Sequence, residues 1–229
     1  MLATSFVEFG EARFQVAKKP SNPAALNSRI SEYIVYRPAI YRRNGIRWIS
    51  AYAWRSRRQA RGLAELKKAK QAPDSSLVAA ATTSIVNLIE EIFGDKAADA
   101  ITCIPCGHSK RADCFGKQLA NGVAALLDIP FVQVFADRPL LGASHPKTCA
   151  SLPPLQQQIA VPPPSIIIID DLATSGWHIE EAMVRLRSSR VKVTSVVWIS
   201  GVSSGKPSEN DQSIISSRRP SSYGPYQSM

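Results

Sequence analysis

Two adjacent carboxylates, Asp170 and Asp171, directly follow four consecutive isoleucines, Ile166 to Ile169. A short β-branched run of this kind predicts a strand buried on both faces, as in a parallel sheet. Both carboxylates cannot be buried without partners, because burying an isolated charge is very costly. They therefore need donors, and ribose hydroxyls, a hydrated metal ion or nearby arginines would each serve.

A small hydroxylated turn, Thr174-Ser175-Gly176, comes next, and a helical pattern starts after it. Hydroxyls and free backbone N–H groups at the start of a helix suit a phosphate. Carboxylates beside an anion-binding turn fit a sugar phosphate, and each charge-assisted hydrogen bond would contribute roughly 1.5–3 kcal/mol. The alternative is an ordinary Asp-capped helix start with a Thr/Ser turn, which binds nothing.

Strand-like and helical patterns alternate along the middle of the chain. This alternation implies right-handed crossovers and an α/β fold with a mostly parallel central sheet flanked by helices. The carboxyl ends of parallel strands open on one edge, where ligands bind, so we expect three polar loops to meet there: 106–111, 138–147 and 170–178. We expect strands at 100–105, 129–135, 165–170 and 191–199, and helices at 75–93, 113–127 and 177–189.

Positive charge is concentrated in the first third of the chain. Residues 1–72 hold 15 Lys+Arg against 4 Glu and no Asp, whereas the remaining residues hold 13 basic and 14 acidic side chains. Aromatics and arginines interleave over 33–54, and we expect a basic helix over 51–71. Such a segment would bind DNA or RNA through residues 33–72. Alternatively, its aromatics pack on the domain and its arginines form a solvated face.

These patterns divide the chain into three expected parts: a basic N-terminal extension over 1–72, an α/β domain over 73–200, and a disordered tail over 201–229. Two short strands are also expected, at 6–9 and 13–16. No apolar run approaches the roughly 20 residues of a membrane span. The N-terminus lacks the positive region of a secretory signal, and four cysteines in 229 residues do not indicate a disulfide scaffold. We therefore expect a cytoplasmic protein that does not contact a membrane.

The cysteines allow a rival interpretation as a metal site. Cys103, Cys106, His108 and Cys114 have types and spacings that a zinc ion accepts. However, Cys103 falls inside a predicted strand, and a second CxxC pair is missing. We therefore do not expect zinc, and Cys149 receives no role.

The stretch Ile166-Ile-Ile-Ile-Asp-Asp-Leu-Ala-Thr-Ser-Gly176 resembles the phosphoribosyl pyrophosphate (PRPP) motif of type I phosphoribosyltransferases. That motif is four apolar residues, two acids, a short apolar pair and then Thr-Thr/Ser-Gly. The segment Cys103-Ile-Pro-Cys-Gly-His-Ser-Lys-Arg-Ala-Asp-Cys-Phe-Gly116, followed by a helix, is similar to the ComF-like branch, which is linked to DNA uptake. The resemblance covers about residues 75–200 and implies a type I phosphoribosyltransferase fold.

The resemblance also implies roles for individual residues. Asp170 and Asp171 would hold the ribose hydroxyls, with Asp171 as the candidate base, and Ala173, Thr174, Ser175, Gly176, Trp177 and His178 would surround the 5′-phosphate. Cys106, Gly107 and His108 would contact pyrophosphate, and His145 or Lys147 would close over the site. Mg²⁺ would arrive with PRPP, with Asp170 as its candidate protein ligand. The acceptor base is not identified, and a homodimer is an open expectation.

Two departures from the family pattern stand out. The motif ends Gly-x-Thr in the family, but Gly176-Trp177-His178 stands here, so a histidine replaces the threonine. ComF-like proteins often carry an N-terminal zinc ribbon, whereas residues 1–72 contain no cysteine. The alternative function is therefore PRPP, nucleotide or nucleic-acid binding without turnover.

Overall fold

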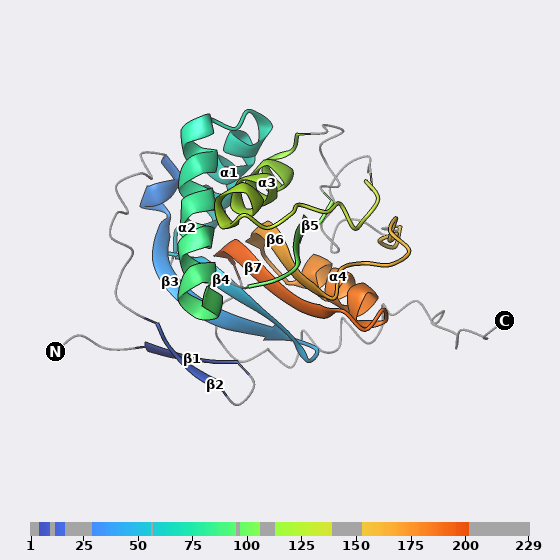
Figure 1. The fold of residues 1–229 in the computed structure, drawn as a ribbon. Coiled ribbons are helices and arrows are strands. Elements are labelled where there is room, and N and C mark those ends of the chain that lie inside the picture. The colour runs from blue at the N-terminus through green and yellow to red at the C-terminus, as the bar shows by residue number, and fades with distance from the viewer. Residues whose placement is uncertain are drawn as a thin grey trace.

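A computed structural model describes residues 5–9, 12–16, 29–55, 57–94, 97–105, 113–138 and 153–201. Its centre is a five-stranded sheet in the order β3-β4-β7-β6-β5, covered by helices on both faces (Figure 1). β3 runs antiparallel to β4, and the other neighbouring strands pair in parallel. The expected α/β fold with a mostly parallel sheet is therefore confirmed. The strands span Ile34–Arg43 (β3), Ile46–Trp54 (β4), Ala100–Cys103 (β5), Ser165–Ala173 (β6) and Lys192–Ser200 (β7).

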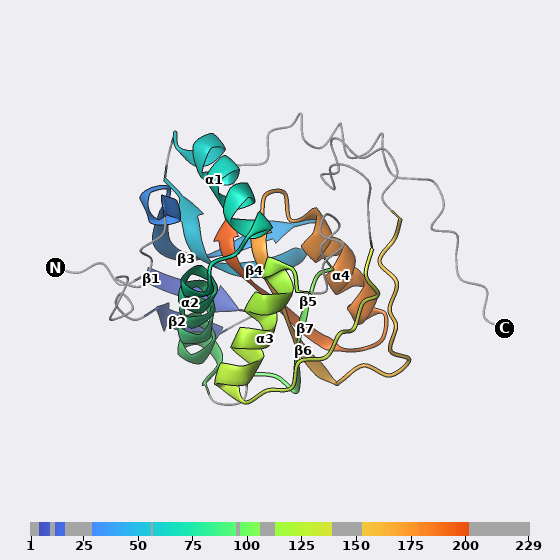
Figure 2. The same cartoon turned by 90° about the horizontal axis from the view of Figure 1, so that it is seen from above.

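Helices cover the two faces of the sheet unequally. On one face, α1 (Gln59–Gln71), α2 (Ser75–Phe93) and α3 (Phe115–Leu127) pack together, and α4 (Trp177–Arg187) covers the other face (Figure 2). Each face of the sheet packs into its own hydrophobic core. Ile167 and Ile169 of β6 pack into the core on the face of α2, and Ile166 and Ile168 pack into the core on the face of α4. The four isoleucines therefore form a strand that is buried on both sides, as the sequence predicts.

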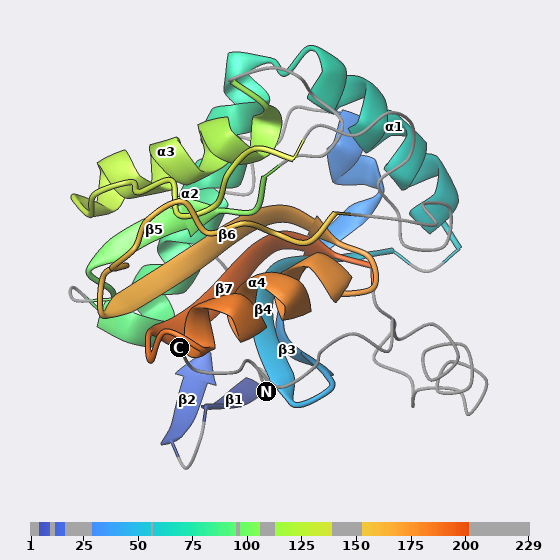
Figure 3. The ribbon, with the colours of Figure 1, turned by 90° about the vertical axis from the view of Figure 1, so that its right-hand side faces the viewer.

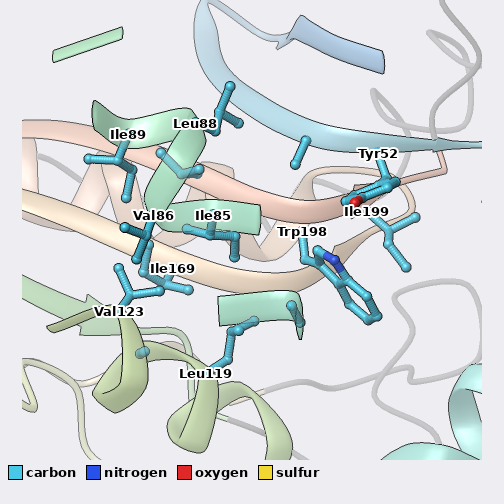
Figure 4. Packing of buried hydrophobic residues seen from close by; sticks show 14 of the residues in the cluster. Tyr52, Ile85, Val86, Leu88, Ile89, Leu119, Val123, Ile169, Trp198 and Ile199 are labelled. Atoms are coloured by element: carbon cyan, nitrogen blue, oxygen red, sulfur yellow. The ribbon is translucent and has the colours of Figure 1, made fainter. Parts of the chain in front are cut away.

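Helix α2 is the main apolar element of the first core. Asp74 caps it by accepting the Ser76 backbone N–H at 3.2 Å, and it ends at Gly94, where φ is +67°. Ile85, Leu88 and Ile89 are fully buried and belong to the same cluster as Ile169 and Trp198 (Figure 4). By length and composition alone, α2 would be able to span a membrane, but its burial against the sheet is that of a core helix.

Residues 34–54 belong to the central sheet, which corrects the expectation of a separate extension over 1–72. β4 pairs in parallel with β7, with Ile49 opposite Val196. The expected helix over 51–71 starts only at Gln59, because residues 51–54 continue β4. The sequence carried a signal for this hairpin: Asn44 and Gly45 both have positive φ, 47° and 77°, as an Asn-Gly turn requires.

The expected strand at 129–135 does not form as a ladder. Phe131 makes an isolated parallel bridge to Ile101, and Phe135 makes an isolated antiparallel bridge to Gln157. Pro130 has no N–H to donate, which interrupts strand pairing at this point. Val134 and Phe135 are nevertheless buried, so the segment still packs against the sheet next to β5.

The described residues at the N-terminus include a second, two-stranded sheet. β1 (Ser5–Phe9) and β2 (Ala12–Val16) pair antiparallel and match the expected short strands. The tail expected over 201–229 lies outside the described residues except for Gly201.

Candidate functional site

The order of the strands predicts that a ligand would bind between β5 and β6. These strands are neighbours, but the chain leaves them on opposite faces: α3 follows β5 on the face of α2, and α4 follows β6 on the other face (Figure 3). Such a switch point opens a crevice outside the carboxyl ends of the two strands, where ligands of α/β proteins bind. The acid pair and the turn that starts α4 both lie at this edge.

β6 reaches past the end of β5. Cys103, the last residue of β5, pairs with Ile169, whereas β6 continues along β7 until Ala173 pairs with Ser200. Asp170 and Asp171 therefore both lie within β6, which continues three residues past the expected end of the strand at residue 170. They are beyond the end of β5, so no strand in the described part of the chain pairs with this part of β6 on that side. Because successive strand residues alternate, Asp171 projects toward the face of α1 and α3 and Asp170 toward the face of α4.

Asp171 is paired with a lysine from α1. The Lys70 Nζ lies 2.6 Å from Asp171 Oδ2, and the two side chains are 29% and 8% exposed. Helix α3 approaches the same carboxylate, since a Cβ added to Gly116 would lie 4.0 Å from Oδ2. Sequence reasoning missed Lys70, because nothing in its pattern indicates a contact with a residue so far along the chain.

Asp170 is partly exposed at the end of the crevice. Its Oδ1 accepts the backbone N–H of Asp171 at 2.9 Å. Among the described residues there is no cluster of three or more His, Cys, Asp or Glu side chains able to hold a metal ion. Mg²⁺ usually binds through one or two carboxylates together with substrate phosphates. The acid pair near the end of β6 has the chemistry that such a magnesium ion requires, and Asp170 would be its protein ligand.

The turn that starts α4 is built around a glycine. Gly176 has φ of +72°, and a Cβ there would overlap the Trp48 ring. Both the conformation and the space therefore require glycine at this position. Thr174 and Ser175 precede it and are partly exposed. The backbone N–H groups at the start of α4 form the anion-binding end of that helix.

The β3–β4 hairpin braces this turn. Arg43 donates to the Ser175 carbonyl at 3.1 Å and to Glu180 at 2.6 Å, and its guanidinium lies 5.6 Å from the centre of the Trp177 ring. Asn44 donates to the other Glu180 oxygen at 2.9 Å. These contacts fix the first turn of α4, and their distance along the chain hides them from sequence analysis.

His178 lies beside a buried arginine. Arg138 is 6% exposed, and its guanidinium is 3.3 Å from His178 Nδ1. Arginine has only donors, so Nδ1 accepts and Nε2 carries the proton of a neutral ring. Arg138 also donates to both Glu181 oxygens at 3.0 Å and to the Pro153 carbonyl at 2.7 Å. This network joins the chain on both sides of residues 139–152 to α4, the helix that follows the Thr174–Gly176 turn.

Cys103 is a core residue at the end of β5. It is 8% exposed, and burial raises the pKa of its thiol to about 12, with Lys117 acting in the opposite direction and nearby carboxylates reinforcing the shift. A thiol with this pKa is protonated at neutral pH. Cys103 therefore packs as an apolar side chain, and Cys114, partly exposed, precedes α3.

The structure brings together Asp170, Asp171, Ala173 and the residues from Thr174 to His178 at one edge of the sheet. The other residues that the sequence assigned to the site lie outside the described residues: Cys106, Gly107, His108, His145 and Lys147.

No family model matches the chain, and no curated protein sequence matches it. The solved structures to which the chain is similar include orotate phosphoribosyltransferase from Aeropyrum pernix, at 18% identity over 74% of this chain and 76% of that one, with a TM-score of 0.36. Adenine phosphoribosyltransferase from Saccharomyces cerevisiae is 17% identical over 71% of this chain and 83% of that one, with a TM-score of 0.41. Xanthine-guanine-hypoxanthine phosphoribosyltransferase from Helicobacter pylori is 14% identical over 59% and 80%, with a TM-score of 0.35. The structures found to be similar are phosphoribosyltransferases named for different bases, and at these scores they assign no activity to this chain.

Proposed function

We propose that this protein binds PRPP with Mg²⁺ at the carboxyl edge of β5 and β6 and transfers its phosphoribosyl group to a nitrogenous base. One observation carries the proposal: an acid pair and a glycine-based helix start follow one another at the switch point of the sheet. Carboxylates there accept the ribose hydroxyls, and the backbone N–H groups of the turn bind the 5′-phosphate. The resemblance of residues 166–176 to the PRPP motif supports the same ligand.

The reaction is a displacement at C1′ of the ribose. A lone pair on the acceptor nitrogen forms the new C1′–N bond while the C1′–O bond breaks, and its electron pair leaves with pyrophosphate. The proton lost by the acceptor nitrogen has Asp171 as its candidate acceptor. When bound, Mg²⁺ would offset negative charge on the leaving pyrophosphate. The chain itself contributes positioning: the braced turn fixes the phosphate, and the acid pair fixes the ribose.

The test is a panel of purine and pyrimidine bases, each incubated with Mg²⁺ and PRPP and monitored for pyrophosphate release. We expect release with at least one base, and its loss in the double variant Asp170→Asn/Asp171→Asn. The matched control is Asp128→Asn, which removes an exposed carboxylate at the far end of α3. Tight PRPP binding without turnover by any base would contradict the transferase and leave a binding protein.

A second candidate function is nucleic-acid binding through α1. The surface of α1 and of the two residues before it favours an anionic partner, since five cations there are exposed: Arg57, Arg58, Arg61, Lys67 and Lys68. Deleting residues 1–72 would not test this, because the deletion removes two strands of the central sheet. Replacing the five exposed cations with glutamine leaves both strands in the chain, and circular dichroism checks that this variant is folded. A salt-dependent affinity for a single-stranded oligonucleotide that falls in this variant, and not in Arg187→Gln, would support the second function.

A further inference from the structure

Helix α1 is fastened across the carboxyl edge of the sheet. At its start, Gln59 Nε2 donates to the Gly201 carbonyl just beyond β7 at 3.1 Å. In its middle, Gly62 packs so closely against Trp54 and Tyr33 that a Cβ has no room, and Leu66 is 1% exposed in the core. Near its end, Lys70 pairs with Asp171. Figure 2 shows α1 beside the arrowheads of β7 and β6. These contacts hold α1 at the carboxyl ends of β6 and β7.

The ammonium of Lys70 lies beside a carboxylate that would repel a ligand with several negative charges. The Asp171 side chain is 8% exposed, and it lies next to Asp170 on a strand that leads into an anion-binding turn. A carboxylate in that position repels the phosphates of PRPP, and burial strengthens the repulsion. An ammonium 2.6 Å from Oδ2 offsets this charge. A carboxylate has about four lone-pair sites, so the pair still leaves acceptors for a hydroxyl.

We propose that Lys70 is a positioning residue of the ligand site: its ammonium holds the Asp171 carboxylate in place for the ribose hydroxyls and offsets its charge beside PRPP. The inference rests on the proposed function, and it adds α1 to the site. Lys70 acts through Asp171, so its contribution to binding depends on that carboxylate. Other cations of α1, such as Lys68, which pairs with Glu65 and is 71% exposed, do not share this role.

The test is calorimetric titration of the full chain with Mg²⁺ and PRPP. We expect Lys70→Met to weaken binding about tenfold or more, the loss of one charge-assisted interaction, whereas Lys70→Arg stays within about threefold of wild type. Lys68→Met makes the same change in charge on the same helix and should bind as wild type does. In the Asp171→Asn background, adding Lys70→Met should change the affinity less than about twofold, as expected for residues that act as a unit.

Circular dichroism and thermal melting establish that each variant is folded. If Lys70→Met alone does not fold, Lys70→Arg and the double variant Lys70→Met/Asp171→Asn carry the test, because neither leaves the carboxylate unpaired. Three results would overturn the inference while the wild-type chain still binds PRPP. These are equal losses of affinity in Lys70→Met and Lys68→Met, unchanged affinity in Lys70→Met, or losses of affinity that add in the double variant Lys70→Met/Asp171→Asn. Absence of PRPP binding by the wild-type chain would instead overturn the proposed function, and the inference with it.

Discussion

At the residue scale, the candidate site depends on two tightly constrained residues, Gly176 and Asp171. Gly176 combines a positive φ with contact to the Trp48 ring, so the turn that starts α4 tolerates no side chain at that point. Asp171 is buried and paired. Constraint of this kind preorganises a binding site, because the groups that meet the ligand are already fixed before it arrives.

Gly176→Ala should lower the free energy of unfolding by about 2–4 kcal/mol, the combined cost of a strained backbone and an overpacked contact. Gly45→Ala is the matched control, since Gly45 has a similar φ of +77° but nothing within 4 Å of an added Cβ. It should cost only about 1 kcal/mol. Urea denaturation measures both values, and equal losses would contradict the contact between Gly176 and Trp48.

The Cys103 thiol should resist modification in the folded protein. Burial raises its pKa to about 12, so at pH 8 it is almost entirely protonated and unreactive. In a variant with serine at Cys106, Cys114 and Cys149, Ellman's reagent should react at least ~100-fold more slowly in buffer than in urea. A variant that keeps only Cys114, which is partly exposed, should react faster. Rapid labelling of Cys103 would contradict its place in the core.

At the element scale, the structure changes the role of the first third of the chain. β3 and β4 complete the sheet, their turn braces the start of α4, and α1 closes the edge of the crevice. From the sequence, the aromatic residues over 33–54 would either contact nucleic acid or pack in the core. They belong largely to the core, since Tyr41, Trp48 and Tyr52 are buried. The exposed arginines and lysines of α1 remain available for an anionic partner.

Gly62→Ala tests how closely α1 packs on β4. In an exposed helix this change stabilises by about 1 kcal/mol, but here the added Cβ would overlap Trp54 and approach Tyr33. We therefore expect a net loss of about 1–3 kcal/mol in the free energy of unfolding. Ala64→Gly, on the exposed side of α1, is the control, because it measures only the difference in helix propensity between alanine and glycine. A stabilising Gly62→Ala would show that α1 does not dock as described.

At the scale of the whole molecule, the sequence predicted the elements that carry their own local pattern. The isoleucine run predicted β6, and the Asp74 cap with its helical apolar spacing predicted α2. The alternation of strand and helix patterns predicted the parallel sheet. It missed β4, although Asn44-Gly45 signals a hairpin, because basic and helix-forming residues that follow obscured the strand. The contacts of Lys70 with Asp171 and of Arg43 with Ser175 have no local signal, since only tertiary packing brings such distant residues together.

A structure of the full chain with Mg²⁺ and PRPP tests the central claim most directly, because it locates the ligand. We predict the 5′-phosphate within hydrogen-bonding distance of backbone N–H groups of residues 174–178, and the ribose hydroxyls against Asp170 and Asp171. Lys70 should remain paired with Asp171 in that complex. PRPP bound away from the carboxyl ends of β5 and β6, or oriented with its ribose away from the acid pair, would contradict the account.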